Sequence, residues 1–345
     1  MILILRMICI YQEQTTIASG MRGLQIEATT LIRGDFPVKD LSLSRRAALK
    51  LIGFAASGAM LEGVDVIASP ASLISRKIPS SGEAVPCVGI GTYDSFDVSS
   101  PEQHQQVEEV MRDFARLRGR VVDTSPMYGA AESVIGDVIT ELSLTKELFL
   151  ATKVWIEGRD AGLAQARQSM QRMKTSKLDL IQVHNLLDVD THLSWLKEWK
   201  QKGQVRYIGV THYAEGAYAA LEKQVTEKQV DFVQFNYSMG EREAEKRLLP
   251  AAMASSTAVI VNRPFAKASL FERVKGRPLP AWASEFDAST WAQFFLKYIL
   301  GHPAVTCVIP ATRNPKHLAD NMQAGRGRLP DEKMRQRMVA FWSAL

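Results

Sequence analysis

Cysteine is scarce in this chain, and its scarcity excludes one class of protein. Only three cysteines occur among 345 residues, and no two are spaced as Cys-x-x-Cys. Domains built on a disulfide framework need far more cysteines per residue, so this fold depends on its hydrophobic core. With 46% hydrophobic and 23% charged residues, the composition is that of an ordinary globular protein, and the length allows one large domain or two small ones.

Patterns that bind metals, nucleic acids or phosphates are also missing. The six histidines are scattered and none forms His-Glu-x-x-His, so we expect no metal site. The net charge of +5 arises from 42 basic and 37 acidic residues without a basic run interleaved with aromatics, so we expect no nucleic-acid partner. A P-loop is absent, and Gly89-Ile-Gly91 continues as Thr92-Tyr93-Asp94 rather than as a Gly-x-Gly-x-x-Gly fingerprint.

No apolar run near the N-terminus is long enough to span a bilayer. The run Leu51–Leu61 is well below the roughly 20 residues that a membrane-spanning helix needs, and it fits the hydrophobic part of a signal peptide. The segment before it reads Ser44-Arg45-Arg46-Ala47-Ala48-Leu49-Lys50. Paired arginines ahead of such a run resemble a twin-arginine export signal. The alternative interpretation is a cytoplasmic amphipathic helix.

Small residues after this run offer cleavage after Ala68 or Ala71, and translation can begin as late as Met21. We therefore expect a leader over residues 1–71 and a folded domain over residues 72–345. The leader predicts the twin-arginine export machinery as a partner, a periplasmic location and no stable membrane anchor after cleavage. A leader that does not function predicts a cytoplasmic protein.

From Cys87 onward, short β-rich apolar segments alternate with longer amphipathic ones. We expect eight strands, at Cys87–Thr92, Arg120–Thr124, Leu148–Lys153, Leu178–His184, Val205–Thr211, Asp231–Asn236, Ala258–Arg263 and Val305–Pro310. We expect helices between strands, including Glu102–Leu117, Glu132–Glu141, Ala161–Met173, Thr191–Lys202 and Ala217–Gln224. The strands are continuous apolar runs, as in a parallel sheet that is buried on both faces.

This alternation predicts an α/β protein, and the number of units selects the architecture. Without the leader about 275 residues remain, close to the roughly 250 typical of a (β/α)8 barrel. Eight strand-helix units favour this closed TIM barrel, with an open doubly wound sheet as the second choice. An additional segment, Lys77–Val85 with Ser80-Ser81-Gly82-Glu83 as its turn, predicts an N-terminal hairpin that plugs the bottom of the barrel.

Three neighbouring strands are expected to end in side chains capable of acid-base chemistry. Asp123 is at the end of the second strand, Lys153 of the third and His184 of the fourth. In such barrels the C-terminal strand ends form the catalytic face, so these groups should lie together. Tyr128 follows in the loop after the second strand.

Tyr128 is the candidate proton donor. A phenol has an unperturbed pKa of about 10, too high for an efficient acid at neutral pH. We expect Lys153 to lower that pKa, Asp123 to hold the ammonium in place, and His184 to hydrogen-bond a substrate carbonyl or help to relay the proton. The alternative is a surface tyrosine beside a purely structural Asp123–Lys153 ion pair.

The segment around Tyr128 resembles the first signature of the aldo/keto reductase superfamily. It reads Val122-Asp-Thr-Ser-Pro-Met-Tyr-Gly-Ala-Ala-Glu-Ser133. The lysine of the family falls on Lys153 in Leu150-Ala-Thr-Lys-Val154, and its histidine falls on His184 in Leu180-Ile-Gln-Val-His184. The resemblance extends from about Lys77 to the helix after the eighth strand. It implies that Asp123, Tyr128, Lys153 and His184 form a catalytic tetrad.

The same resemblance implies a reductase that uses NADPH, or NADH, to convert a small carbonyl substrate to an alcohol. It assigns contacts at the nicotinamide end to Gly91, Thr92, Thr211, His212, Gln234, Asn262, Arg263 and Pro264. It assigns contacts with phosphate and adenine to Thr312, Arg313, Lys316, His317, Asp320 and Asn321. The first four of these are expected at or near a helix N-terminus, where backbone N–H groups favour an anion.

Two positions depart from the pattern of the family. Asn262 stands where an aromatic residue commonly stacks on nicotinamide, and Ala311 stands where a basic residue is often found. Both departures bear on how the cofactor is held and on the choice between NADPH and NADH. Arg313 and Lys316 are available to neutralise a 2′-phosphate.

Two other functions compete with a carbonyl reductase. The first is a barrel that binds the nucleotide but acts as a redox-sensing or regulatory subunit, against which the complete tetrad argues. The second is an isomerase or lyase in which Lys153 forms a Schiff base. Nothing in the sequence names the carbonyl substrate or the oligomeric state.

Overall fold

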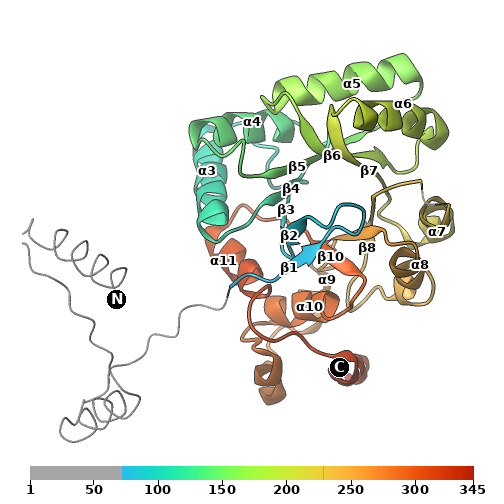
Figure 1. Ribbon diagram of the computed structural model, residues 1–345. Coiled ribbons are helices and arrows are strands. Elements are labelled where there is room, and N and C mark those ends of the chain that lie inside the picture. Colours follow the sequence, from blue (N-terminus) through green and yellow to red (C-terminus); the bar gives the residue numbers. More distant parts are fainter. Residues whose placement is uncertain (1–71, 228) are drawn as a thin grey trace, which may run out of the picture. The chain divides into compact units, whose positions relative to one another are not determined.

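The computed structural model describes residues 72–227 and 229–345, so the expected leader lies outside the described residues. Eight parallel strands form one sheet in the order β10-β9-β8-β7-β6-β5-β4-β3, which curls into a ring with helices around it (Figure 1). The strands are β3 (Ile90–Gly91), β4 (Val121–Asp123), β5 (Phe149–Val154), β6 (Leu178–His184), β7 (Val205–Thr211), β8 (Phe232–Asn236), β9 (Ala258–Asn262) and β10 (Val305–Val308).

Isolated parallel bridges between the first and last strand regions complete the ring. Val88 pairs with Val308 and Gly91 with Ala311. Each of the eight expected strands overlaps an observed one, so the predicted (β/α)8 barrel is confirmed and the open sheet is excluded. Side chains at the C-terminal strand ends therefore converge on one mouth.

Helices follow most strands and cover the outside of the barrel. They are α3 (Pro101–Arg116), α4 (Ala131–Glu141), α5 (Arg159–Arg172), α6 (Val189–Gln201), α7 (Tyr218–Thr226), α8 (Leu248–Ala254), α9 (Ser269–Arg273), α10 (Trp291–Leu300), α11 (Pro315–Gln323) and α12 (Glu332–Ala344). Short 3-10 turns are η1 (Glu215–Ala217), η2 (Glu243–Glu245) and η3 (Ala281–Phe286). Among the helices of the described residues, none has the length and apolar character needed to cross a membrane.

Helix α3 illustrates why the sequence forms these elements. Ser100 caps its N-terminus by accepting a hydrogen bond from the backbone N–H of Gln103, and Pro101 occupies the first helical position. The apolar residues recur at helical spacing, so that one stripe is buried against the barrel, at Val107, Val110, Met111 and Phe114.

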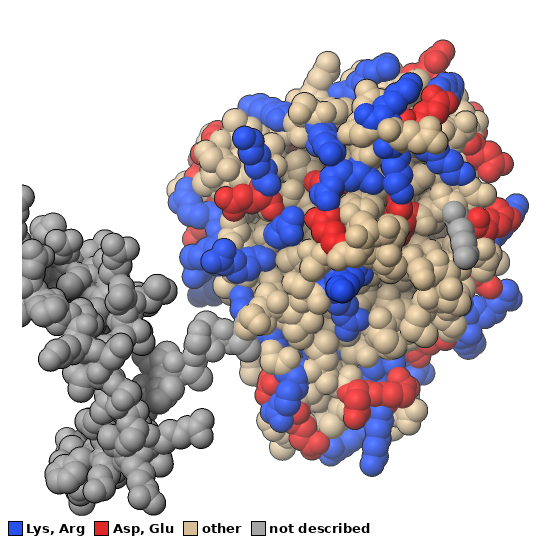
Figure 2. All heavy atoms as spheres, viewed as in Figure 1, with Lys and Arg blue, Asp and Glu red and all other residues tan. Residues whose placement is uncertain are grey.

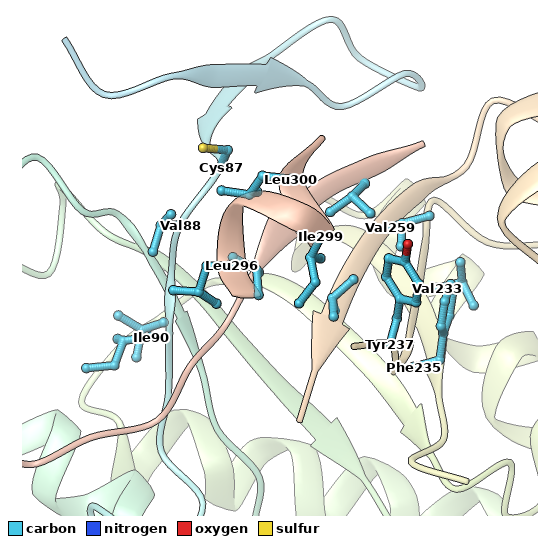
Figure 3. Close-up of a cluster of buried hydrophobic side chains, with 14 of the residues drawn as sticks. Cys87, Val88, Ile90, Val233, Phe235, Tyr237, Val259, Leu296, Ile299 and Leu300 are labelled. Atoms are coloured by element: carbon cyan, nitrogen blue, oxygen red, sulfur yellow. The ribbon is translucent and has the colours of Figure 1, made fainter. Parts of the chain in front are cut away.

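The barrel has one core outside its wall and a second inside it. Figure 3 shows part of the outer core, where Leu296 and Ile299 of α10 lie near Val259 of β9. The inner cluster contains Ile78 and Val85 of the hairpin, Ile309 just after β10, and the strand residues Val121, Phe149, Ala151, Leu180, Tyr207, Phe232, Ala258, Ile260 and Cys307.

The N-terminal hairpin closes the lower end of the inner core, as predicted. Strands β1 (Ser75–Lys77) and β2 (Ala84–Pro86) pair antiparallel and lie in the middle of the ring in Figure 1. Ile78 is fully buried, and Val85 is almost fully buried, within the cluster that fills the barrel. The Tyr207 hydroxyl donates to the Glu83 carboxylate at 2.8 Å and so ties the hairpin to β7.

Positive and negative side chains are interspersed on the face shown in Figure 2. Arg206 donates to Asp179 at 2.6 Å and also contacts Glu83, which lies 3.7 Å from Arg120. These ion pairs are partly open to solvent and contribute modestly to folding, so the stability of the lower end depends mainly on the buried hairpin residues.

We expect Ile78→Ala to lower the free energy of unfolding by about 2–5 kcal/mol, because the substitution leaves a cavity inside the barrel. Urea denaturation measures this change. Ser80→Ala in the exposed turn serves as the control and should stay within about 0.5 kcal/mol of the parent. Equal changes in the free energy of unfolding for the two substitutions would contradict the conclusion that the hairpin plugs and stabilises the barrel.

Candidate active site

A buried ion pair lies at the C-terminal end of the barrel. Lys153 on β5 is fully buried and Asp123 at the end of β4 is 2% exposed. The Lys153 Nζ atom lies 2.6 Å from Asp123 Oδ2 and 2.7 Å from the carbonyl oxygen of Thr124, to which it also donates. These short bonds fix the ammonium between two neighbouring strand ends.

Tyr128 lies beside this pair. The Lys153 Nζ atom is 5.0 Å from the centroid of the Tyr128 ring. Gly129, with φ 54°, makes the turn after Tyr128, and a Cβ there would lie 2.2 Å from an Asp97 carboxylate oxygen. Only glycine fits this turn, which leads directly into α4.

Opposing effects act on the proton of Tyr128. Burial raises the pKa of the phenol, the positive charge of Lys153 lowers it, and Asp123 raises it; the net pKa lies above the usual value of 10.0. As expected, Lys153 lowers this pKa, but desolvation outweighs the ammonium and the net pKa is raised. Tyr128 is therefore a protonated phenol at neutral pH.

Lys153 remains charged despite its burial. Desolvation lowers the pKa of the ammonium, but Asp123 and Tyr128 raise it by more, so the net pKa is above the usual 10.5. A permanent positive charge thus lies next to the phenol throughout the neutral range.

His184 at the end of β6 faces Tyr128, with ring centroids 6.0 Å apart. Burial, the charge of Lys153 and the nearby His212 lower the pKa of its imidazole to about 3. The His184 Nδ1 atom lies 3.2 Å from the hydroxyl oxygen of Ser125. The ring is therefore neutral at physiological pH, and one nitrogen is already engaged by a partner that the sequence reasoning missed.

Two amide side chains also hold Asp123. Its Oδ1 atom accepts from Gln182 Nε2 at 3.1 Å and from Gln234 Nε2 at 2.9 Å. Gln234 was expected to contact the cofactor, whereas nothing in the sequence singled out Gln182. The carboxylate is thus hydrogen-bonded on both oxygens by three side chains.

A second buried carboxylate ties the Tyr128 loop to the Lys153 strand. Glu132 in the first turn of α4 accepts from the Thr152 hydroxyl at 2.5 Å and from Arg172 at 2.7 Å. Thr152 immediately precedes Lys153, so α4 is anchored to β5 next to the ammonium. Glu132 lies within the signature segment, but nothing in the sequence indicated its role.

This geometry is accompanied by a clear relationship to known proteins. The model of the Aldo/keto reductase family matches residues 87–338. The chain belongs to the aldo/keto reductase family. The uncharacterized oxidoreductase YqkF of Bacillus subtilis is 23% identical over 302 residues, covering 75% of this chain and 94% of the relative. Methylglyoxal reductase YeaE of Escherichia coli is 26% identical over 255 residues, covering 71% and 88% respectively.

Solved structures of aldo/keto reductases share the fold. The structure of an aldo/keto reductase from Klebsiella pneumoniae in complex with NADP and acetate has a TM-score of 0.65 at 24% identity, covering 76% of this chain and 93% of that one. The holo form of an aldo-keto reductase from Bacillus halodurans has a TM-score of 0.65 at 20% identity, covering 78% and 96%. The predicted family and the predicted class, a nicotinamide-dependent oxidoreductase acting on carbonyls, are confirmed.

The residues expected to contact the nicotinamide lie at or just after the C-terminal ends of strands, around the mouth of this aldo/keto reductase. Gly91 ends β3, and Thr92 follows it, fully buried, with a hydroxyl that has no partner. Thr211 at the end of β7 donates to Gln234 Oε1 at 3.1 Å. His212 stacks on the next ring along the chain, that of Tyr213, with centroids 5.3 Å apart.

The end of β9 and the residue after it carry two unpartnered polar atoms. Asn262 Nδ2 donates to Gln234 at 3.3 Å, whereas its buried Oδ1 has no partner. Arg263 donates through Nη1 to the carbonyl oxygen of Tyr213 at 2.9 Å, and its Nε is buried without a partner. Pro264 follows directly. Together with the Thr92 hydroxyl, these atoms are hydrogen-bonding groups that a polar nucleotide can satisfy.

The expected phosphate residues lie at the start of α11. Asn314 caps this helix, and Thr312 and Arg313 precede it; Lys316 and His317 are exposed in its first turn. Arg313 Nη1 donates to the carbonyl oxygen of Ser95 at 3.2 Å, which anchors the guanidinium near β3. The expected helix start is confirmed, and its N–H groups and cations favour an anion.

Asp320 and Asn321 are less available to a ligand than the sequence suggested. Asp320 accepts from the Thr290 hydroxyl at 2.9 Å and from Gln293 Nε2 at 2.6 Å, so its carboxylate is tied to the start of α10. Asn321 is 4% exposed. Contact of these two side chains with adenine stays a prediction.

Large apolar side chains surround the mouth. Tyr93, Met127, Trp155, Ile156 and Tyr213 follow strands β3, β4, β5 and β7, and each is exposed by at least 38%. The Tyr93 ring lies 5.1 Å from that of Tyr128, and the Trp155 ring lies 6.0 Å from that of His184. Large apolar side chains therefore border Tyr128 and His184 at the mouth. In the part of the chain that the structure describes, no group of His, Cys, Asp and Glu is arranged to hold a metal ion.

We expect His184 to show no titration midpoint between about pH 5 and 8, because burial and Lys153 hold its pKa at about 3. An unfolded histidine takes up a proton at about pH 6.5, so this group makes folding less favourable as the pH falls from that value towards 3. Nitrogen-edited NMR of the imidazole, assigned with a His184→Gln variant, measures the midpoint. A midpoint near the ordinary value of about 6.5 would contradict the site geometry.

Proposed function

We propose that this protein reduces an aldehyde or ketone to an alcohol with NADPH, using Tyr128 as the proton donor. The observation that carries the proposal is the buried Lys153–Asp123 pair, 2.6 Å between charged atoms, beside the Tyr128 phenol. The substrate is a small carbonyl compound that enters through the apolar mouth.

Proton transfer from Tyr128 is the chemistry that the chain itself supplies. Burial keeps the hydroxyl protonated at neutral pH, so the donor is loaded before the reaction. As a substrate carbonyl gains electron density, the hydroxyl protonates its oxygen and a phenolate forms. The charged ammonium of Lys153 stabilises that phenolate, and it is more effective inside the barrel than in water because the surroundings are less polar.

His184 orients the substrate oxygen in this proposal. The Ser125 hydroxyl oxygen already accepts the backbone N–H of Met127 at 3.2 Å, so its own hydrogen can be donated to His184 Nδ1. The imidazole hydrogen then lies on Nε2, where it can be donated to a carbonyl oxygen. A neutral imidazole suits this role because it polarises the carbonyl without competing with Tyr128 to protonate it.

The nucleotide supplies a hydride to the carbonyl carbon when bound. The unpartnered atoms of Thr92, Asn262 and Arg263 fit its nicotinamide half. Arg313 and Lys316 at the start of α11 fit its phosphates, including a 2′-phosphate. The K. pneumoniae reductase in complex with NADP shares this barrel, which supports NADPH as the cofactor.

The assembled tetrad disfavours a purely regulatory barrel. A nucleotide sensor has no need of a buried ammonium, whose desolvation is costly, next to a phenol. The same contacts disfavour Schiff-base chemistry, because Lys153 is held by Asp123 and its pKa is raised, which keeps the amine protonated and not nucleophilic.

We expect Tyr128→Phe to lower the kcat of carbonyl-dependent NADPH oxidation by about 100-fold or more, because the proton donor is lost. Binding of NADPH, followed by fluorescence titration, should be unchanged. Tyr207→Phe is the matched control, since that hydroxyl bonds Ser81 and Glu83 at the opposite end of the barrel. Full activity of Tyr128→Phe would disprove the mechanism, and absence of turnover in the parent with intact NADPH binding would favour a regulatory barrel.

We also propose that the protein reaches the periplasm through the twin-arginine export machinery. The support is the sequence Ser44–Lys50 followed by the apolar run Leu51–Leu61. A folded barrel with its cofactor bound is a suitable cargo for a pathway that moves folded proteins.

We expect residues 1–71 to export a fused reporter, and we expect replacement of both Arg45 and Arg46 by Lys to abolish that export while charge is kept. Fractionation of a bacterial host with an active twin-arginine pathway measures the reporter. Periplasmic reporter at equal levels with both leaders, or cytoplasmic reporter with the native leader, would refute the proposal.

A further inference from the structure

Gln182 is a buried amide inside the barrel, and the proposed mechanism gives its side chain no role. It lies on β6, is fully buried, and donates from Nε2 to Asp123 Oδ1 at 3.1 Å. Gln234 donates to the same oxygen at 2.9 Å, and Lys153 contacts Oδ2 at 2.6 Å. The carboxylate that holds the ammonium is therefore itself held by two neutral donors.

The neighbouring strand leaves room for this amide. Gly209 on β7 pairs with Gln182 in the sheet register. A Cβ at Gly209 would lie 3.1 Å from Gln182 Cγ and 2.8 Å from the carbonyl oxygen of Phe232. Glycine at this position thus accommodates the Gln182 side chain as it reaches Asp123.

Packing alone does not explain a glutamine here. Its Oε1 is buried without a hydrogen-bond partner, which costs free energy that an apolar side chain of similar size would not cost. Within the described residues, the side chain of Gln182 makes one hydrogen bond, to Asp123. A role of this contact in the reaction would explain why a buried amide is kept despite its cost in folding free energy.

We propose that Gln182 is a positioning residue that tunes Tyr128 as a proton donor through Asp123 and Lys153. The inference rests on the proposed function. The amide takes up part of the negative charge of Asp123, so that the carboxylate draws the ammonium less strongly and more of the positive charge of Lys153 acts on the phenol. Without the amide, the full negative charge of Asp123 offsets more of the positive charge of Lys153. The Tyr128 phenol then becomes a weaker acid.

The other titratable groups around this network are few. Tyr128 is influenced by Lys153, Asp123 and Tyr93, and His184 lies close enough for Lys153 to act on it. His212 influences His184 from β7, and the thiol of Cys307 on β10, whose pKa is raised by burial, is influenced by Asp123. Both imidazoles have lowered pKa values, so they stay neutral when Tyr128 titrates, and burial raises the pKa of the thiol.

The test compares Gln182→Met with the parent protein. Met fills the space but cannot donate to Asp123. We expect kcat at neutral pH to fall about tenfold in both reaction directions, with the dissociation constant of NADPH within twofold of the parent. For alcohol oxidation, which needs the phenolate, the pH of half-maximal kcat should rise by about one unit, so that activity is recovered at higher pH.

Gln182→Glu gives a second, independent variant. It keeps the shape and, once ionised at the alkaline pH where Tyr128 titrates, places a negative charge facing Asp123 in place of a donor, so the midpoint should move further in the same direction. Thr306→Val is the matched control, because it removes a buried hydrogen bond of the same 3.1 Å length, to the backbone N–H of Val259, away from the catalytic network. The control should leave the midpoint unchanged.

A readout without turnover separates this inference from the proposed function. Ultraviolet difference absorption of tyrosinate, with the Tyr128→Phe protein subtracted, gives the midpoint of Tyr128 directly. An upward shift in Gln182→Met supports the inference even if no carbonyl substrate is found. An unchanged midpoint in both glutamine variants, or the same shift in Thr306→Val, overturns it; failure of the parent to turn over any carbonyl counts against the proposed function alone.

Discussion

The pairing of Lys153 with Asp123 inside the barrel is the constraint on which the rest of the mouth depends. Two charges removed from water are costly, and they persist only when each is well hydrogen-bonded. The barrel meets that condition because parallel strands end side by side, so that the ammonium reaches a carboxylate and a backbone carbonyl at 2.6 and 2.7 Å. Loss of either partner would leave a buried charge unpaired, typically at about 3–5 kcal/mol, so the arrangement cannot drift. Tyr128 thus lies against a charge with a fixed position, and its chemistry follows from that position.

The fold was predictable because its signals were repeated. Eight apolar runs separated by helical patterns left little choice of architecture, and the hairpin was visible as a turn sequence between β-rich segments. The tetrad was predictable for a related reason: three of its members stand at the C-terminal ends of consecutive strands, where the topology alone brings them together. Family membership and the fold agree with these predictions, whereas the role of each site residue remains a proposal that rests on the geometry.

The contacts and burial of individual site residues could not be predicted, because they depend on distances across the barrel. Gln182 reads as one polar residue in an apolar strand, and only the structure shows its amide on Asp123. The sequence predicted the effect of Lys153 on Tyr128 but gave no measure of burial, which proved to be the larger effect on the phenol. Asp320 matched an adenine contact by position, yet Thr290 and Gln293 engage its carboxylate. The partners of Gln182 and Asp320 lie far away in the chain, and no local pattern marks them.

The way in which the ring of strands closes affects where the barrel can open locally. Strands β6 and β7 pair along most of their length, whereas the first and last strand regions meet through two single bridges, Val88 with Val308 and Gly91 with Ala311. Few backbone hydrogen bonds must therefore break for the barrel to open along this seam, as between β3 and β4, which also pair at two positions. Gly91 and Arg313 lie at its upper end, and Arg313 already reaches across it to Ser95. A dinucleotide bound to both edges of this seam would link them. The protein with bound dinucleotide would then open more slowly and resist proteolysis better than the protein without it.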